Sequence, residues 1–152
     1  MTDYGSIETH LTTQLSLTHR PVAVASLTHA PAGIEKFEGV QPSGCSFWML
    51  ASRGRTFYTV AADHYNCAIG SHTHNIPLPP DRAHELDDTL GFMTGIGYLR
   101  MEEGPEIPRL PDTPGVVVYA PLGDTPVDPD VVLFWGPPGK VMLLQEAAIR
   151  AG

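Results

Sequence analysis

The sequence contains few cysteines, few charged residues and no long hydrophobic run. Charged side chains make up 17% of the 152 residues, which is below the quarter or so that is usual in globular proteins. Lys and Arg number 9 against 17 Asp and Glu, and the formal net charge is −8. Because this balance would repel a phosphate backbone, we exclude nucleic acid as a partner.

Membrane and secretion signals are also missing from the sequence. No apolar run approaches the roughly 18 to 20 residues that a membrane-spanning helix needs, so we expect no membrane partner. The first residues, MTDYGSIETHLTTQ, do not have the charged-then-apolar pattern of a secretion signal. We therefore expect a cytoplasmic location, where the two cysteines are reduced, metal-bound or catalytic rather than joined in a structural disulfide.

Glycine and proline, 15 of each, divide the chain into short segments. Apolar periodicity and capping residues predict helices, and runs of β-branched and aromatic residues predict strands. The expected helices cover 7–17, 46–52, 85–101 and 140–152, and the expected strands cover 22–27, 56–62, 116–122 and 131–135. This order predicts a single compact α/β or α+β domain over residues 1–152, with short strands in a mixed sheet and flanking helices.

Both cysteines and three of the seven histidines lie between positions 45 and 74. Thiolates and imidazoles are the main protein ligands for zinc, iron and copper, so this segment predicts a cofactor site. We expect Cys45 at a helix N-terminus, where the helix dipole and free amides favour a thiolate. The candidate cofactor-binding residues are Cys45, Cys67, His64, His72 and His74. The candidate metal ligands are Cys45, Cys67 and His74.

The residues leave the identity of the cofactor open. There is no CxxC pair, so the spacing is not that of a zinc ribbon, although a site with two Cys and two His ligands for zinc is geometrically possible. Two cysteines cannot complete the four-thiolate set of an ordinary iron–sulfur cluster, so a cluster would need histidine, another cysteine or a partner subunit. Haem is a third candidate, with a pocket lined by Phe47, Trp48, Phe57 and Tyr58.

Two functions without a metal are compatible with the same residues. In a thiol enzyme, Cys67 would be the nucleophile, with His64 or His72 as the base and Asp63 or Asn66 as the orienting group. In a non-enzymatic binding module, the cysteines would be small core residues and the apolar strands would form an oligomer interface or a small-molecule site.

The order of several segments resembles the DUF169 family of archaeal and bacterial proteins. These segments are RPVAV, SGCSFWMLA, GRTFYT, DHYNCAIGSHTHN, ELDDTLGFMTGIGYL and VVVYAPLGDTPVDPDVVLFWG. The resemblance spans Arg20 to Glu146, and it implies a longer protein in which a further glycine-flanked cysteine follows the QEAA segment. We hypothesise that this cysteine would join Cys45 and Cys67 in a three-thiolate set, the present chain being a fragment or a subunit.

We therefore expect a metal-cofactor protein, an iron–sulfur redox or sensing protein in the first place, with zinc or haem as alternatives. Because two cysteines supply only half of the four thiolates of an ordinary cluster, we expect a homo-oligomer or a partner chain to complete the site.

Overall fold

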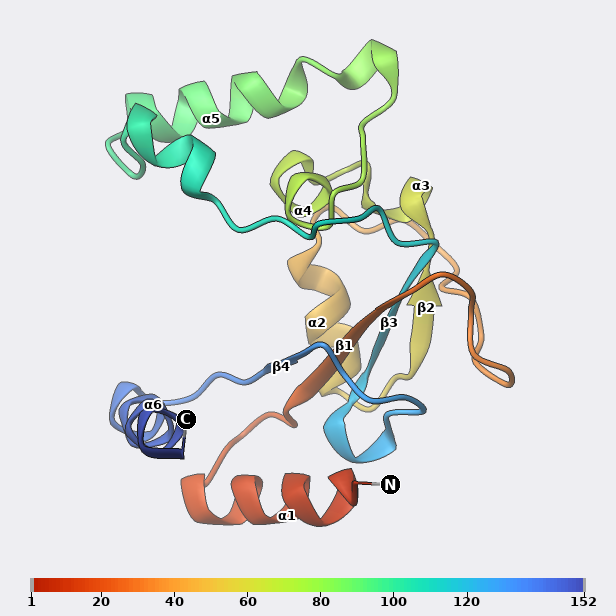
Figure 1. Ribbon diagram of the computed structural model, residues 1–152, viewed down its shortest axis with the longest axis vertical. Coiled ribbons are helices and arrows are strands. Elements are labelled where there is room, and N and C mark those ends of the chain that lie inside the picture. Colours follow the sequence, from red (N-terminus) through yellow and green to blue (C-terminus); the bar gives the residue numbers. More distant parts are fainter. Residues whose placement is uncertain (1, 152) are drawn as a thin grey trace.

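The computed structural model describes residues 2–151, and at its centre lies a four-stranded sheet in the order β2-β3-β1-β4 (Figure 1). The strands are β1 (Val22–Leu27), β2 (Phe57–Thr59), β3 (Val116–Pro121) and β4 (Val131–Leu133). The ladders between these strands are antiparallel, and an isolated parallel bridge joins Lys36 to Tyr58. The strand predicted over 22–27 is thus confirmed at both ends.

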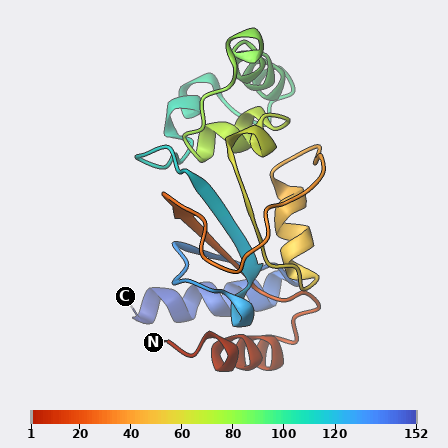
Figure 2. The same cartoon turned by 90° about the vertical axis from the view of Figure 1, so that its right-hand side faces the viewer.

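Strand β3 is the most deeply buried element of the sheet. All six of its residues are buried, and it pairs with β1 on one side and β2 on the other. A strand covered on both faces is expected to be a continuous apolar run, as VVVYAP is. Helix α2 (Cys45–Ser52) covers one face of the sheet (Figure 2) and inserts Phe47 into the core. The core cluster consists of Val22, Val24, Phe37, Phe47, Ala51, Phe57, Val117 and Tyr119.

The other helices lie at the two ends of the sheet (Figure 1). They are α1 (Tyr4–Leu15), α3 (Ala61–His64), α4 (Ala68–Thr73), α5 (Glu85–Gly95) and α6 (Pro138–Ala151), with short 3-10 turns η1 (Pro80–Arg82), η2 (Met101–Glu106) and η3 (Leu122–Asp124). Helices α3, α4 and α5 lie at one end, and α1 and α6 lie at the other. Strands and helices form a single compact α+β domain, one of the two classes that the sequence left open, and the sheet has antiparallel ladders where a mixed sheet was expected.

Several predicted helices and strands end earlier than the sequence suggested, and the largest differences are in α5 and β2. Helix α5 stops at Gly95, and Gly97 adopts a φ of 73°, a left-handed conformation that ends helices and that glycine adopts without strain. The second predicted strand stops at Thr59. The Asp63 carboxylate accepts a hydrogen bond from the Val60 N–H at 2.8 Å and so caps the start of α3.

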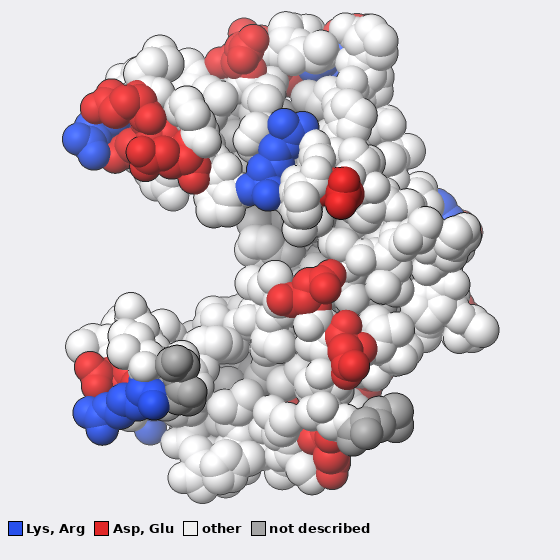
Figure 3. All heavy atoms as spheres, viewed as in Figure 1, with Lys and Arg blue, Asp and Glu red and all other residues white. Residues whose placement is uncertain are grey.

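Helices α5 and α6 project on the same side of the sheet, and the molecular surface is hollowed between them (Figure 3). Both carry exposed apolar side chains, among them Phe92 on α5, with Ile96 directly after that helix, and Met142 and Leu143 on α6. Among the helices of residues 2–151, none is both long enough and apolar enough to cross a bilayer.

Two glycine-to-alanine substitutions should change stability in opposite directions. A Cβ on Gly115 would overlap the carbonyl oxygen of Thr28, whereas a Cβ on Gly91 in α5 meets no atom within 4 Å. We expect Gly115→Ala to lower the free energy of unfolding by about 1–3 kcal/mol through overpacking. Gly91→Ala should raise it by roughly 0.5–1 kcal/mol through helix propensity. Urea unfolding measures both; equal effects of the two variants would contradict this packing.

Candidate functional site

The two cysteines lie at helix starts that touch each other. Cys45 is the first residue of α2, as predicted, and Cys67 is the N-cap of α4; both are free thiols. The Cα of Gly44 lies 3.7 Å from the position that a Cβ on Gly70 would occupy. The fold therefore brings the segments that carry the two candidate thiol ligands into van der Waals contact.

Gly70 connects the Cys67 thiol to a histidine. Its N–H donates to the Cys67 Sγ at 3.3 Å, and its carbonyl oxygen lies 2.8 Å from the Nδ1 of His74. A Cβ at this position would lie 3.0 Å from the same Sγ, so any side chain would press against the thiol. Glycine is thus needed here because of a close approach and not because of its backbone angles.

The hydrogen bonds of His74 determine which ring nitrogen carries the proton. A carbonyl oxygen only accepts, so the Nδ1 of the neutral ring donates to Gly70 and the Nε2 keeps its lone pair. That Nε2 lies 3.4 Å from the hydroxyl of Tyr119, which can donate to it. Burial lowers the pKa of His74, partly offset by the bond to Gly70. The imidazole is therefore held in a neutral form of the kind that binds metals.

His64 is a buried histidine with one unsatisfied nitrogen. Its side chain is 1% exposed, and its Nε2 lies 2.8 Å from the Oγ1 of Thr59. The Thr59 hydroxyl donates to the carbonyl oxygen of Val117, so the His64 Nε2 donates to Thr59. Within residues 2–151 the His64 Nδ1 has no hydrogen-bond partner. Burial, together with the nearby His74 ring at 5.0 Å, lowers the pKa of His64 to about 4.

Tyr119 was not among the residues predicted from the sequence. It is fully buried in β3, and its hydroxyl points to the His74 Nε2. Burial raises the pKa of Tyr119, and the nearby Cys45 and Cys67 thiols raise it further. The sequence signal that could have identified Tyr119 was a tyrosine within a predicted apolar strand, because a buried hydroxyl group needs a hydrogen-bond partner.

The remaining sequence-predicted residues have other neighbours. Burial and the charge of Arg109 lower the pKa of His72. Asp63 caps α3 through the bond to Val60, and Asn66 accepts a hydrogen bond from Arg82 at 3.2 Å. The His64 Nε2, one of the bases proposed for a Cys67 nucleophile, is bonded to Thr59, and the proposed orienting groups Asp63 and Asn66 have the partners just named.

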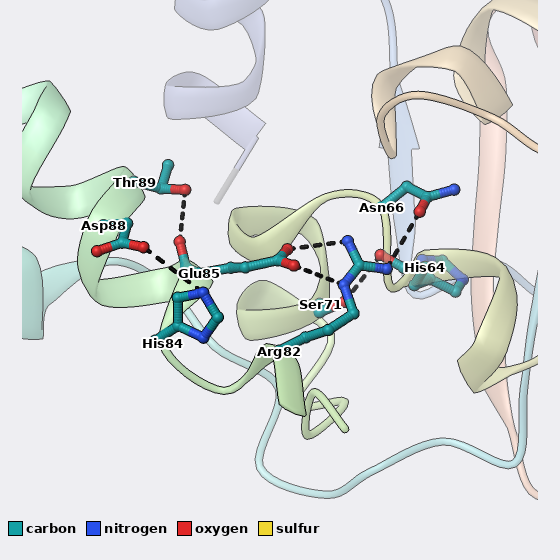
Figure 4. Close-up of polar contacts among 8 residues, drawn as sticks. All are labelled: His64, Asn66, Ser71, Arg82, His84, Glu85, Asp88 and Thr89. Atoms are coloured by element: carbon teal, nitrogen blue, oxygen red, sulfur yellow. Dashed lines mark hydrogen bonds and ion pairs between the residues drawn. The ribbon is translucent and has the colours of Figure 1, made fainter. Parts of the chain in front are cut away.

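A polar network holds the segment around Cys67 in place (Figure 4). Arg82 donates to the Glu85 carboxylate at 2.6 and 2.9 Å and to the Asn66 Oδ1 at 3.2 Å. This guanidinium therefore ties the start of α5 to the turn before α4. On the other side, the Ser71 hydroxyl donates to the carbonyl oxygen of His64 at 2.9 Å. These bonds fix the short helix that carries one thiol.

The structure also bears on the alternative cofactors. Phe47 and Phe57, expected to line a haem pocket, are each 1% exposed and pack against each other in the core at a centroid distance of 6.1 Å. Within residues 2–151, no three His, Cys, Asp or Glu side chains are grouped so that they could hold a metal ion. The three-ligand set of Cys45, Cys67 and His74 stays a prediction.

The burial of neutral His64 should make the metal-free protein less stable in mild acid. Its pKa is about 4 in the folded chain and 6.5 for a histidine in an unfolded chain. Between pH 4 and pH 6.5 the unfolded state therefore binds more protons than the folded state. This contribution to stability is complete above pH 6.5 and is lost as the pH falls toward 4, by about 3 kcal/mol at most. Urea unfolding at several pH values measures the slope, which His64→Gln should reduce. The exposed control, His10→Gln, should keep it; equal slopes in both variants would contradict the assignment.

Comparison with known proteins gives one family match. The model of the DUF169 family, described as "Uncharacterised ArCR", matches residues 10–151. No curated protein and no solved structure matches the chain. The family match covers nearly the whole chain, including both cysteines and every histidine of the site. The chain therefore belongs to the DUF169 family.

Proposed function

We propose that Cys45 and Cys67 are ligands of an iron–sulfur cluster that the protein uses for electron transfer or redox sensing. The observation that carries this proposal is that the two thiols lie at the starts of α2 and α4, two helices whose N-terminal ends approach each other at Gly44 and Gly70. Cysteine thiolates are the usual ligands of iron–sulfur clusters. Two thiols on packed backbone elements give a defined ligand geometry, which a cofactor site requires.

A backbone hydrogen bond reaches one of the two candidate ligand sulfurs. The Gly70 N–H donates to the Cys67 Sγ, and hydrogen bonds to the ligand sulfurs are one of the features that set the potential of a cluster. The imidazole linked to Cys67 through Gly70 is His74, whose Nδ1 donates to the Gly70 carbonyl, so that its Nε2 carries the lone pair that a metal would take in place of the Tyr119 hydroxyl. In metal-binding histidines, the ring nitrogen that does not bind the metal commonly donates to a carbonyl oxygen, and this contact orients the ring.

Two thiolates leave the coordination incomplete, so the proposal includes a second source of ligands. Cys45 is exposed, which allows a ligand from a second copy of the chain or from a partner chain to reach the same metal. Zinc bound by the same thiols is the nearest alternative cofactor. We also propose a cytoplasmic location, because a reducing compartment keeps both thiols free for the metal.

Anaerobic purification and metal analysis test this function. Wild-type protein, as isolated or after reconstitution with iron and sulfide, should contain iron and acid-labile sulfide and absorb broadly in the visible range. Cys45→Ser and Cys67→Ser should each lose most of the bound iron while remaining folded, because serine is a poor ligand for iron. His74→Asn should lower the iron content if His74 is a ligand.

The matched control is Ser46→Ala, which changes the same turn of α2 without removing a thiol, and it should bind iron as the wild type does. If the purified protein contained stoichiometric zinc and no acid-labile sulfide, the site would be a zinc site and the iron–sulfur proposal would be wrong. A metal-free protein whose folding is unchanged in both cysteine variants would contradict the proposal.

A further inference from the structure

An apolar hollow of about 360 Å³ opens beside Cys45. In Figure 1 its walls, α2 and β4, lie between the projecting helices α5 and α6, and Figure 3 shows the recess there. The hollow is lined by Cys45, Trp48 and Met49 from α2 and by Leu133, Phe134 and Trp135 from the end of β4 and the residues after it. It is separate from the buried histidines, none of which lines it.

The walls of the hollow are fixed by the fold. Cys45, Trp48 and Met49 are three and four residues apart, so they lie on one face of α2. Opposite them, the β1–β4 ladder pairs Leu133 with Val22. Trp48, Leu133 and Trp135 are partly buried and pack against the core cluster. The concave shape is therefore built from side chains that the core holds in place.

We infer that this hollow binds a neutral, planar aromatic molecule of small size. Its volume falls within the roughly 300–1,000 Å³ of ligand pockets. The lining side chains carry no formal charge, so a charged ligand would lose its hydration without gaining a partner. Both tryptophans of the chain line the hollow together with Phe134, and ring faces favour an aromatic occupant over an aliphatic one.

This inference goes beyond the proposed iron–sulfur function and does not depend on it. Five of the six lining side chains are uncharged residues that hold no metal in the proposed function, so the hollow keeps its chemistry whether or not Cys45 is a ligand. If both proposals hold, the bound ring lies next to the cluster ligand. The two are separable by experiment, because the hollow is tested with metal-free protein.

Binding of N-phenyl-1-naphthylamine, an uncharged aromatic probe, tests the inference. The probe should bind saturably at one site per chain and receive excitation energy from the tryptophans. Met49→Glu places a charge on the wall of the hollow and should weaken binding about tenfold or more. Met142→Glu makes the same substitution on α6, at a position that is 64% exposed, and should leave the affinity unchanged.

Three results of the binding measurements would overturn the inference. They are the absence of saturable binding, equal weakening by the two glutamate variants, and tighter binding of an alkanol than of a naphthol of similar size. A dimer that Met49→Glu dissociates, and with which the probe competes, would also overturn it, because a second copy would then fill the hollow.

A second measurement uses wild-type protein and so avoids any folding defect of a variant. Cys45 lines the hollow and Cys67 does not. An occupied hollow should slow the alkylation of Cys45 by iodoacetamide and leave that of Cys67 unchanged, as read by peptide mass spectrometry. Unchanged labelling of Cys45 at saturating probe would contradict binding at this place.

Discussion

A buried phenol has to find a hydrogen-bond partner, and in this protein that requirement connects the sheet to the segment with the chemically active side chains. Tyr119 lies in the most deeply buried strand, and the partner of its hydroxyl is the Nε2 of His74. His74 is in turn held by Gly70, whose N–H donates to Cys67. These contacts form one chain from Tyr119 to Cys67. Loss of the Tyr119 hydroxyl would therefore remove the contact that connects α4 and its thiol to the sheet.

Helix α2 joins the same arrangement from the other side. Phe47 anchors the helix in the core, against the rings of Phe57 and Tyr119. With that residue fixed, the helical rotation places Cys45 at the exposed start of α2 and turns Met49 toward the apolar hollow. One helix therefore supplies a core anchor, a thiol and a ligand-sized surface, because its faces point in different directions.

The sequence predicted the local features of this protein well. The helix start at Cys45, the strand over 22–27 and the α+β class follow from turn residues and apolar periodicity, which act over a few positions. The Tyr119 to His74 contact could not be predicted in this way. It depends on the pairing of β3 with β1 and β2, and single-sequence periodicity does not give the order of strands. The hollow escaped prediction for the same reason, since its two walls are distant in sequence.

The central claim is that folding gathers Cys45 and Cys67 at one place. Dibromobimane tests it directly, since it becomes fluorescent when it cross-links two neighbouring thiols. The folded, metal-free protein should give a cross-link between Cys45 and Cys67 within one chain, with a lower yield in denaturant and none in Cys45→Ser. Reaction of both thiols in the folded chain without any cross-link would contradict the account.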